Sequence, residues 1–304
     1  MEVVLALGGG GVKCFAQLGV LEALEAQGVR VRAVAATSAG GLVGAGYAAG
    51  HSVPTLIDML SAAQAQAVPF RARRGDALLD ARAGHDVIER LVGRCTFAEL
   101  ELPLALTVVE LASGTPRVLD CGPVAPALRA AIAVPGLFAP ECAEGVRLID
   151  GGAVDPVPVR AARSLAPGLP VLAVIVTPAL ADGARHPVTA RLDALPVVRR
   201  LRRLRLVRAF EVFVRAADIS HRALLESRLA IDRPEIVVRP RVLHLDLFGA
   251  VDVADVIREG RRAAHAVLSD RADQPGLDPR SFGSAAAAAA FSRATASATG
   301  TPAP

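Results

Sequence analysis

The sequence predicts an α/β protein with a mainly parallel sheet, and its first fifty residues supply most of the evidence. Residues 3–7 form a short apolar run that ends at a glycine, as a buried parallel strand does. Residues 12–27 carry apolar side chains at helical spacing and also stop at a glycine. A second apolar run at 29–36 leads into a helix of small residues at 40–49. This order predicts a βαβ unit, and therefore parallel strands.

The later elements predict one large domain. We expect further strands at 103–111, 146–149, 171–177 and 235–238, and helices at 55–65, 81–91, 126–132 and 253–268. Beyond about residue 270 the chain is rich in Ala, Ser, Pro, Gly and Thr and has little to bury. The sequence therefore predicts a domain over residues 1–270 and a disordered tail over 271–304.

Composition excludes several classes of protein. Of the 304 residues 52% are hydrophobic and 21% charged, which suffices for a sizeable core. A net charge of +4 and 3% aromatic residues give little to bind or stack nucleic acid, so no such partner is expected. No apolar stretch is long enough to span a bilayer and the N-terminus is acidic, which predicts a cytoplasmic protein. The cysteines lack metal-ligand spacing, and we expect reduced thiols and no metal at Cys14, Cys95, Cys121 and Cys142.

Ser38 is the candidate nucleophile. It lies in the segment 36–40, Ala-Thr-Ser-Ala-Gly, where the second strand should give way to a helix. A serine at such a sharp turn projects its Oγ above the carboxyl edge of the sheet, and small neighbours such as Gly40 let helix and strand pass closely. The usual pattern has glycine where this chain has Ala36. A serine that only caps the helix would leave the same local signature.

A run of glycines after the first strand predicts an anion-binding loop. Consecutive glycines, here Gly9, Gly10 and Gly11, allow backbone N–H groups to converge on an anion. A dinucleotide fingerprint fails because Cys14 replaces its third glycine and no acidic residue ends the second strand. The Walker pattern fails as well, so an oxyanion hole is the better interpretation, with Lys13 either adding positive charge or lying in solvent.

Asp150 is the candidate base. With Gly151 and Gly152 it follows the strand at 146–149, so its carboxylate should lie at the same sheet edge as Ser38. An ordinary Asp-Gly turn is the alternative. A Ser-His-Asp triad would need a histidine in a turn after a strand, which none of His51, His85, His186, His221, His244 and His265 provides. A Ser-Asp dyad is the simpler interpretation.

Taken in order, these motifs resemble the patatin-like phospholipase family. The shared features are Leu7 to Lys13, Ser38, the helix and Pro-containing loop at 129–138, and Asp150 to Val159. The resemblance extends over most of residues 3–160, and the segments 236–240 and 247–264 look like the closing strand and helix of the family. The departures are Ala36 and Cys14, each where glycine is common.

The resemblance implies a three-layer α/β/α fold and hydrolysis of acyl-lipid esters without a metal or cofactor. It also implies a Ser38–Asp150 dyad and an oxyanion hole from Gly9, Gly10 and Gly11. A weakly active or inactive lipid-binding scaffold is the rival from another class, and an acyltransferase or thioesterase could use the same dyad.

A basic amphipathic segment points to a membrane surface. Six arginines lie between Arg199 and Arg208, while apolar residues recur at helical spacing from Val197 to Phe210. Such a helix suits anionic lipid headgroups, so peripheral membrane contact is expected here. A solvated helix that packs its apolar stripe on the domain would carry the same pattern.

Overall fold

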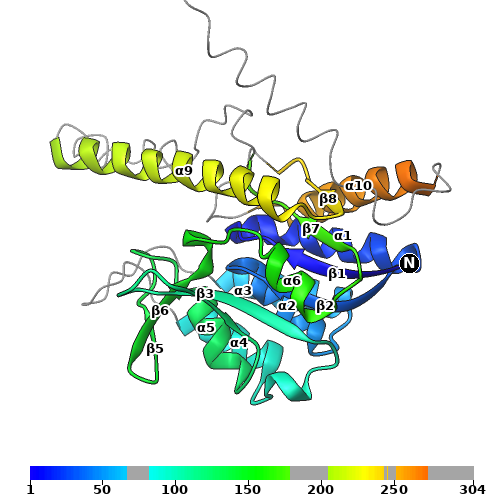
Figure 1. The fold of residues 1–304 in the computed structure, drawn as a ribbon, viewed down its shortest axis with the longest axis horizontal. Coiled ribbons are helices and arrows are strands. Elements are labelled where there is room, and N and C mark those ends of the chain that lie inside the picture. Colours follow the sequence, from blue (N-terminus) through cyan, green and yellow to red (C-terminus); the bar gives the residue numbers. More distant parts are fainter. Residues whose placement is uncertain (67–81, 179–204, 243–244, 246–250, 273–304) are drawn as a thin grey trace, which may run out of the picture.

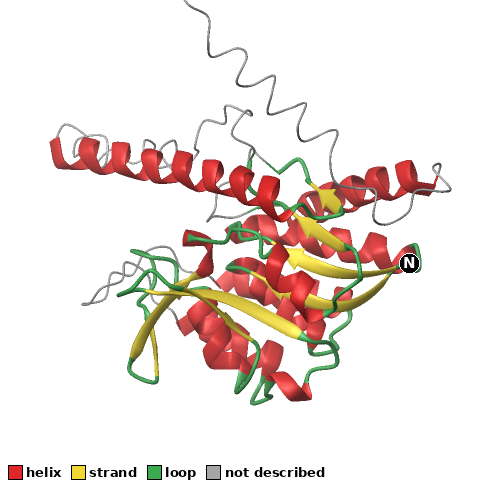
Figure 2. Ribbon diagram, viewed as in Figure 1, coloured by secondary structure: helices red, strands yellow, loops and turns green. Residues whose placement is uncertain are grey.

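A computed structural model describes residues 1–66, 82–178, 205–242, 245 and 251–272. An eight-stranded sheet lies between helices on both of its faces (Figures 1 and 2). The strands are β1 (Glu2–Leu7), β2 (Arg30–Ala36), β3 (Leu104–Glu110), β4 (Pro116–Leu119), β5 (Glu141–Ala143), β6 (Val146–Asp150), β7 (Val171–Val174) and β8 (Ile236–Val238). The α-helices are α1 (Phe15–Ala26), α2 (Ala39–Ala48), α3 (Val53–Gln66), α4 (Arg82–Val92), α5 (Val124–Ala131), α6 (Val159–Leu165), α9 (Arg205–Asp232) and α10 (Val253–Ala272). Short 3₁₀ turns are η1 (Gly11–Cys14), η2 (Phe97–Glu99) and η3 (Gly151–Ala153).

The sheet is parallel through most of its width. Strands β8, β7, β1, β2 and β3 are successive parallel neighbours, whereas β4, β5 and β6 pair antiparallel at the far edge. The expected mainly parallel sheet is therefore confirmed, and the antiparallel edge adds two strands, β4 and β5, that the sequence did not predict.

Strand β3 brings the ends of β2 and β6 together. The first half of β3 pairs with β2, ending at Leu106 opposite Ala36, and its second half pairs with β6, beginning at Val108 opposite Asp150. Strand β4 pairs with Leu106 to Val109 and so overlaps both. Since a strand has only two edges, β2 and β6 must share the edge of β3 opposite to β4. Their carboxyl ends consequently meet beside Thr107.

Two cores of different size cover the two faces of the sheet. Along β1, Val3, Leu5 and Leu7 point into the larger core, which α1 to α5 and α10 cover, while Val4 and Ala6 point into the smaller one. Alternate side chains on opposite faces are what a strand buried on both sides requires. Helices α6 and α9 cover the smaller core, where Leu225 of α9 is fully buried. The three-layer α/β/α fold is thus confirmed.

Helices α1 and α10 approach each other through two glycines. A Cβ on Gly19 would overlap the backbone of Ile257, and a Cβ on Gly260 would overlap the backbone of Ala16. Only glycine fits at such a crossing, so the two helices pack backbone against backbone although more than 200 residues separate them in sequence.

Most predicted elements occur within a few residues of their expected bounds. The predicted first helix begins as the 3₁₀ turn η1, whose first residue, Gly11, has a φ of 58°. Helix α6 was not predicted, and of the long helix α9 only the beginning falls within the predicted amphipathic segment. Helix α10 continues to Ala272, and the predicted tail beyond it lies outside the described residues, as do 179–204, His186 and His244.

Candidate active site

Ser38 occupies a strained turn between β2 and α2. Its φ of 56° and ψ of −135° are rare for a residue with a side chain, and such strain clusters at functional sites. The turn forms with Ala36 in place of the usual glycine, and Ala36 is completely buried in the larger core. The replacement therefore fits the fold without moving Ser38 off the carboxyl edge of the sheet.

Glycines allow three backbone segments to meet at this turn. A Cβ on Gly40 would lie 2.7 Å from the Leu7 carbonyl oxygen and 2.8 Å from that of Gly8. A Cβ on Gly9 would lie 2.8 Å from the Cβ of Ser38. Real Cβ atoms do not approach other atoms so closely, so both positions require glycine. The glycine loop is consequently pressed directly against Ser38.

The Asp150 carboxylate accepts a hydrogen bond from the Ser38 hydroxyl. It accepts another from the Gly152 amide, at 2.8 Å between N and Oδ1, and Asp150 is only 4% exposed. The shared edge of β3 explains this meeting of residues 112 positions apart. A Cβ on Gly151 would lie 2.5 Å from the Thr107 carbonyl oxygen, so that glycine is also required.

Burial makes Asp150 an unusually basic carboxylate. Loss of hydration raises its pKa to about 6, while the hydrogen bonds from Ser38 and Gly152 act in the opposite direction. A carboxylate with a pKa close to neutral can accept a proton more readily than an exposed one and is still ionised at pH 7. The geometry and the pKa therefore both suit a general base.

Two buried threonines, Thr37 and Thr107, form hydrogen bonds that connect the segments carrying Ser38 and Asp150. The Thr37 hydroxyl donates to the carbonyl oxygen of Asp155 at 2.9 Å, and it lies 2.6 Å from the hydroxyl of Thr107. Both side chains are buried, so these hydrogen bonds satisfy groups that water cannot reach. They tie β2 to β3 and to the loop after Asp150. The sequence predicted neither contact: Thr37 lies within the segment 36–40 but at a position where the motif does not specify the residue, and Thr107 lies in no motif.

The amides of the glycine loop differ in whether they have a backbone acceptor. The Gly8 amide donates to Val174 and the Gly9 amide to Pro156, at 3.0 and 3.1 Å. Within the described part of the chain, the amides of Gly10 and Gly11 have no acceptor. The Gly9 amide thus already has a partner, and the lack of a side chain at Gly9 makes room for Ser38. The contribution of Gly9 to an oxyanion hole stays a prediction.

Side chains fix the loop in this conformation. Gln17 is fully buried and donates to the Gly8 carbonyl oxygen at 2.7 Å, and the Thr177 hydroxyl donates to that of Gly9 at 3.2 Å. Lys13 is 5% exposed in η1, with its Cβ next to Gly10. The solvated alternative for Lys13 is therefore excluded, because its side chain is buried beside the loop.

His221 of α9 is a neighbour of the site that sequence analysis set aside. Its ring hydrogen bonds with the backbone of Gly152, and its Cε1 would lie 3.8 Å from a Cβ built on that glycine. Burial lowers the pKa of the imidazole. His221 follows no strand and lies in no motif, so its position became evident only once α9 was placed across the smaller core.

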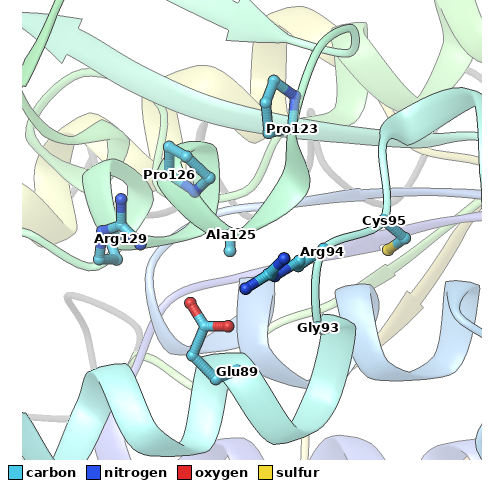
Figure 3. A pocket seen from close by; sticks show the side chains of 8 residues that line it. All are labelled: Glu89, Gly93, Arg94, Cys95, Pro123, Ala125, Pro126 and Arg129. Carbon is cyan, nitrogen blue, oxygen red and sulfur yellow. The ribbon is translucent and has the colours of Figure 1, made fainter.

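A cavity of about 330 Å³ between α4 and α5 shares no residue with this site (Figure 3). It is lined by Glu89, Gly93, Arg94, Cys95, Pro123, Ala125, Pro126 and Arg129. Arg129 is paired with Glu141 at 2.9 Å. Among the described residues, no cluster of His, Cys, Asp or Glu side chains could hold a metal ion.

The site combines a strained serine, a glycine loop packed against it and a buried carboxylate, on a three-layer α/β/α fold. The profile of the "Patatin-like phospholipase" family matches residues 5–163, which include every residue of the candidate site named from the sequence. The chain belongs to the patatin-like phospholipase family. Membership supports lipid hydrolase activity at the level of the family.

Relatives agree with this assignment, and a solved structure shares the fold. An uncharacterized NTE family protein of Mycobacterium tuberculosis, Rv1063c, is 32% identical over 169 residues, 52% of this chain and 44% of its own. A lysophospholipase, nte1, of Aspergillus fumigatus is 29% identical over 50% of this chain and 10% of its own. The chain thus matches less than half the length of these relatives. VipD from Legionella pneumophila shares the fold, with a TM-score of 0.52 and 13% identity over 88% of this chain and 66% of its own.

Proposed function

We propose that this protein is a serine hydrolase of acyl-lipid esters, of the phospholipase A or esterase type, with Ser38 as nucleophile and Asp150 as base. The observation that carries the proposal is the hydrogen bond from the strained Ser38 to the buried Asp150 carboxylate. Family membership and the name of the fungal lysophospholipase support the choice of acyl lipids as substrates.

In the acylation step, Asp150 accepts the Ser38 proton as Oγ attacks the ester carbonyl carbon. The oxyanion forms beside the glycine loop, where the Gly10 and Gly11 amides can donate to it and buried Lys13 adds positive charge. Asp150 then gives its proton to the departing alcohol or lysolipid. Water repeats the sequence on the acyl-enzyme, with Asp150 again as base, and releases the fatty acid. No metal or cofactor takes part in this scheme.

Covalent labelling tests the proposal. We expect a fluorophosphonate to add once to the native protein, as measured by intact mass, and not to Ser38→Ala. Hydrolysis of 4-nitrophenyl butyrate should fall by about 10³-fold or more in Ser38→Ala and in Asp150→Asn, as loss of a nucleophile or its base does. A folded protein that neither reacts nor hydrolyses would favour the inactive lipid-binding scaffold, and activity retained in Ser38→Ala would exclude the Ser38 mechanism.

Acyl transfer and thioester hydrolysis are alternatives that use the same Ser38–Asp150 pair. The nucleophile is common to all of them, so labelling does not separate them. Product analysis does: free fatty acid from phospholipid identifies the hydrolase, whereas acyl chains transferred to an added alcohol identify a transferase.

We also propose that α9 contacts an anionic membrane surface. Val212 and Ile219, 67% and 58% exposed, lie on one face of α9 at i and i+7, with exposed Arg215 between them at i+3. Exposed apolar side chains interleaved with arginine suit a lipid headgroup region. The predicted basic segment Arg199–Arg208 runs into the start of α9, but residues 199–204 and the side chains of 205–208 lie outside the described part. A cytoplasmic location with reversible membrane contact is part of this proposal.

Vesicle sedimentation tests the membrane contact. We expect binding to vesicles that contain phosphatidylglycerol, weaker binding to pure phosphatidylcholine, and a loss of binding in the variant Val212→Ser/Arg215→Glu/Ile219→Ser. Equal binding by the variant would contradict the proposal. No helix in the described ranges is long and apolar enough to cross a bilayer.

A further inference from the structure

Gly152 lies in the turn that follows Asp150, and its backbone contacts both Asp150 and a side chain of α9. Its amide donates to Asp150 Oδ1 at 2.8 Å, so its orientation sets the orientation of the carboxylate. The preceding carbonyl, of Gly151, accepts from the amides of Val154 and Asp155 within the turn. The backbone of Gly152, in contrast, receives its hydrogen bond from the side chain of His221.

The imidazole is the donor in this contact. The Gly152 amide already donates to Asp150 Oδ1, so the backbone group that Gly152 offers to the ring is its carbonyl oxygen, which accepts from a ring N–H of His221. The ring lies close to this turn, with its Cε1 3.8 Å from a Cβ built on Gly152, and burial lowers the pKa of the imidazole. Asp218 and Arg222, the charged groups nearest to the ring on α9, act on it in opposite directions.

The part of α9 that carries His221 is held against the domain by a buried leucine and an ion pair. His221, Leu225 and Arg228 follow one another at i, i+4 and i+7, which places them on one face of the helix. Leu225 is fully buried in the smaller core, and the Arg228 guanidinium lies 3.4 Å from Asp155 Oδ2. The same face therefore contacts the Asp150 loop at two points, Gly152 and Asp155.

The far end of the helix is tied to α6. Arg163 donates to the carbonyl oxygens of Asp232 and Arg233, at 2.8 and 3.0 Å, and to Glu235 at 2.9 Å. With its C-terminal half fixed in this way, α9 presents His221 to the turn from a rigid support. Because α9 is fixed, the His221 side chain can restrict the movement of the Gly152 carbonyl group to which it is hydrogen bonded.

We infer that His221 is a positioning residue for the general base: by holding the Gly152 carbonyl, it fixes the turn that aims the Asp150 carboxylate at Ser38. The inference rests on the proposed function, because it gives Asp150 the role of base. It assigns a catalytic contribution to a residue about 60 positions beyond the last residue of the family match.

The test compares His221→Ala with His221→Asn and His221→Gln, whose amides can donate at about the reach of Nδ1 and Nε2. We expect His221→Ala to lower kcat for 4-nitrophenyl butyrate by about 10- to 100-fold, as small misplacements of catalytic groups do, with KM nearly unchanged. One of the two amide variants should recover most of the loss. The rate of fluorophosphonate labelling at Ser38 should fall and recover in parallel.

His265→Ala is the matched control. His265 lies on α10, and its ring hydrogen bonds with exposed Gln27 at 2.8 Å, away from the site. Its loss should leave kcat unchanged. Full activity in His221→Ala, or an equal loss in all three His221 variants, would overturn the positioning role. A fully active Ser38→Ala would instead overturn the proposed function itself, so the two failures are distinguishable.

Discussion

Asp150 is both buried and ionised at neutral pH, although burial normally disfavours the charged form of a carboxylate. It is almost completely buried, yet it is ionised at pH 7 because Ser38 and Gly152 donate hydrogen bonds to it. Burial prevails and leaves the pKa at about 6, so the carboxylate is in its reactive form through the neutral range and loses that form in mild acid.

The first prediction concerns the acid limb of activity. Only ionised Asp150 can accept the Ser38 proton, so kcat/KM should rise with pH and level off above the pKa of about 6. A pH profile with 4-nitrophenyl butyrate measures this. The pKa of Asp155 is also about 6, so the profile should be repeated in Asp155→Asn, where the limb should persist. A limb near pH 4 would mean that Asp150 is better hydrated than its burial indicates.

The second prediction is that ionisation of Asp150 lowers the free energy of unfolding above about pH 6, the range in which Asp150 can act as a base. The folded-state pKa of about 6 exceeds the usual 3.8, so the folded protein holds this proton more tightly than the unfolded chain does. Stability from Asp150 is thus complete at low pH and declines as pH rises through 6, by up to about 3 kcal/mol. Asp150→Asn should abolish the decline, because its amide oxygen can still accept from Gly152.

Urea unfolding of the native protein and Asp150→Asn, at about pH 4 and pH 8, measures the effect. The free energy of unfolding of the variant, relative to the native protein, should be larger at pH 8 than at pH 4. The same difference at both values would contradict the raised pKa.

Ser38 and Asp150 could be singled out from the sequence as candidates because local backbone demands mark them. Ser38 follows the end of β2 and Asp150 ends β6, and each is followed by a glycine where segments pass too closely for a side chain. The contacts of His221, Thr37 and Thr107 could not be predicted, since they depend on helix and strand placements that only tertiary packing sets. The glycine loop was predicted to bind an oxyanion, which stays a prediction, and the partner of the Gly9 amide depends on where the loop at Pro156 folds back.

At the level of elements, the periodic helices and the parallel strands were predictable, whereas most of α9 and the antiparallel strands β4 and β5 were not. The parallel strands are buried on both faces, and their sequences are continuous apolar runs. Strand β4 carries exposed residues, and β5 has only three residues. Only the beginning of α9 falls within the predicted amphipathic segment, because charged residues interrupt the apolar ones in the rest of the helix.

The third prediction concerns the crossing of α1 and α10. Gly19→Ala and Gly260→Ala each place a methyl group on a backbone that cannot give way, at Ile257 and Ala16 respectively. We expect each to lower the free energy of unfolding by about 1–3 kcal/mol, as overpacking does. Thermal unfolding measures this. Gly84→Ala in α4 is the control, because its Cβ would meet nothing nearer than Ile132 Cδ1 at 3.8 Å, and it should be neutral or stabilising.

At the scale of the whole molecule, buried ion pairs as well as apolar contacts hold α9 on the face of the sheet that carries the smaller core. Arg228 lies 3.4 Å from the carboxylates of both Asp155 and Asp232, which joins α9 to the loop that follows Asp150. Burial raises the pKa of Asp155 to about 6, while Arg228 lowers it. This link is electrostatic above that pKa and weakens below it.

The fourth prediction follows from that link. Arg228→Met would leave Asp155 buried beside Asp232 without its cation, and breaking a buried pair typically costs about 3–5 kcal/mol. The loss should be largest above pH 6, where Asp155 is ionised in the native protein, and smaller at about pH 4, where protonation removes the buried charge. Urea unfolding at both pH values measures it. The double variant Arg228→Met/Asp155→Asn should recover part of the loss at high pH, because the amide is neutral; if it recovers none, the contribution of Arg228 is packing of its stem rather than charge.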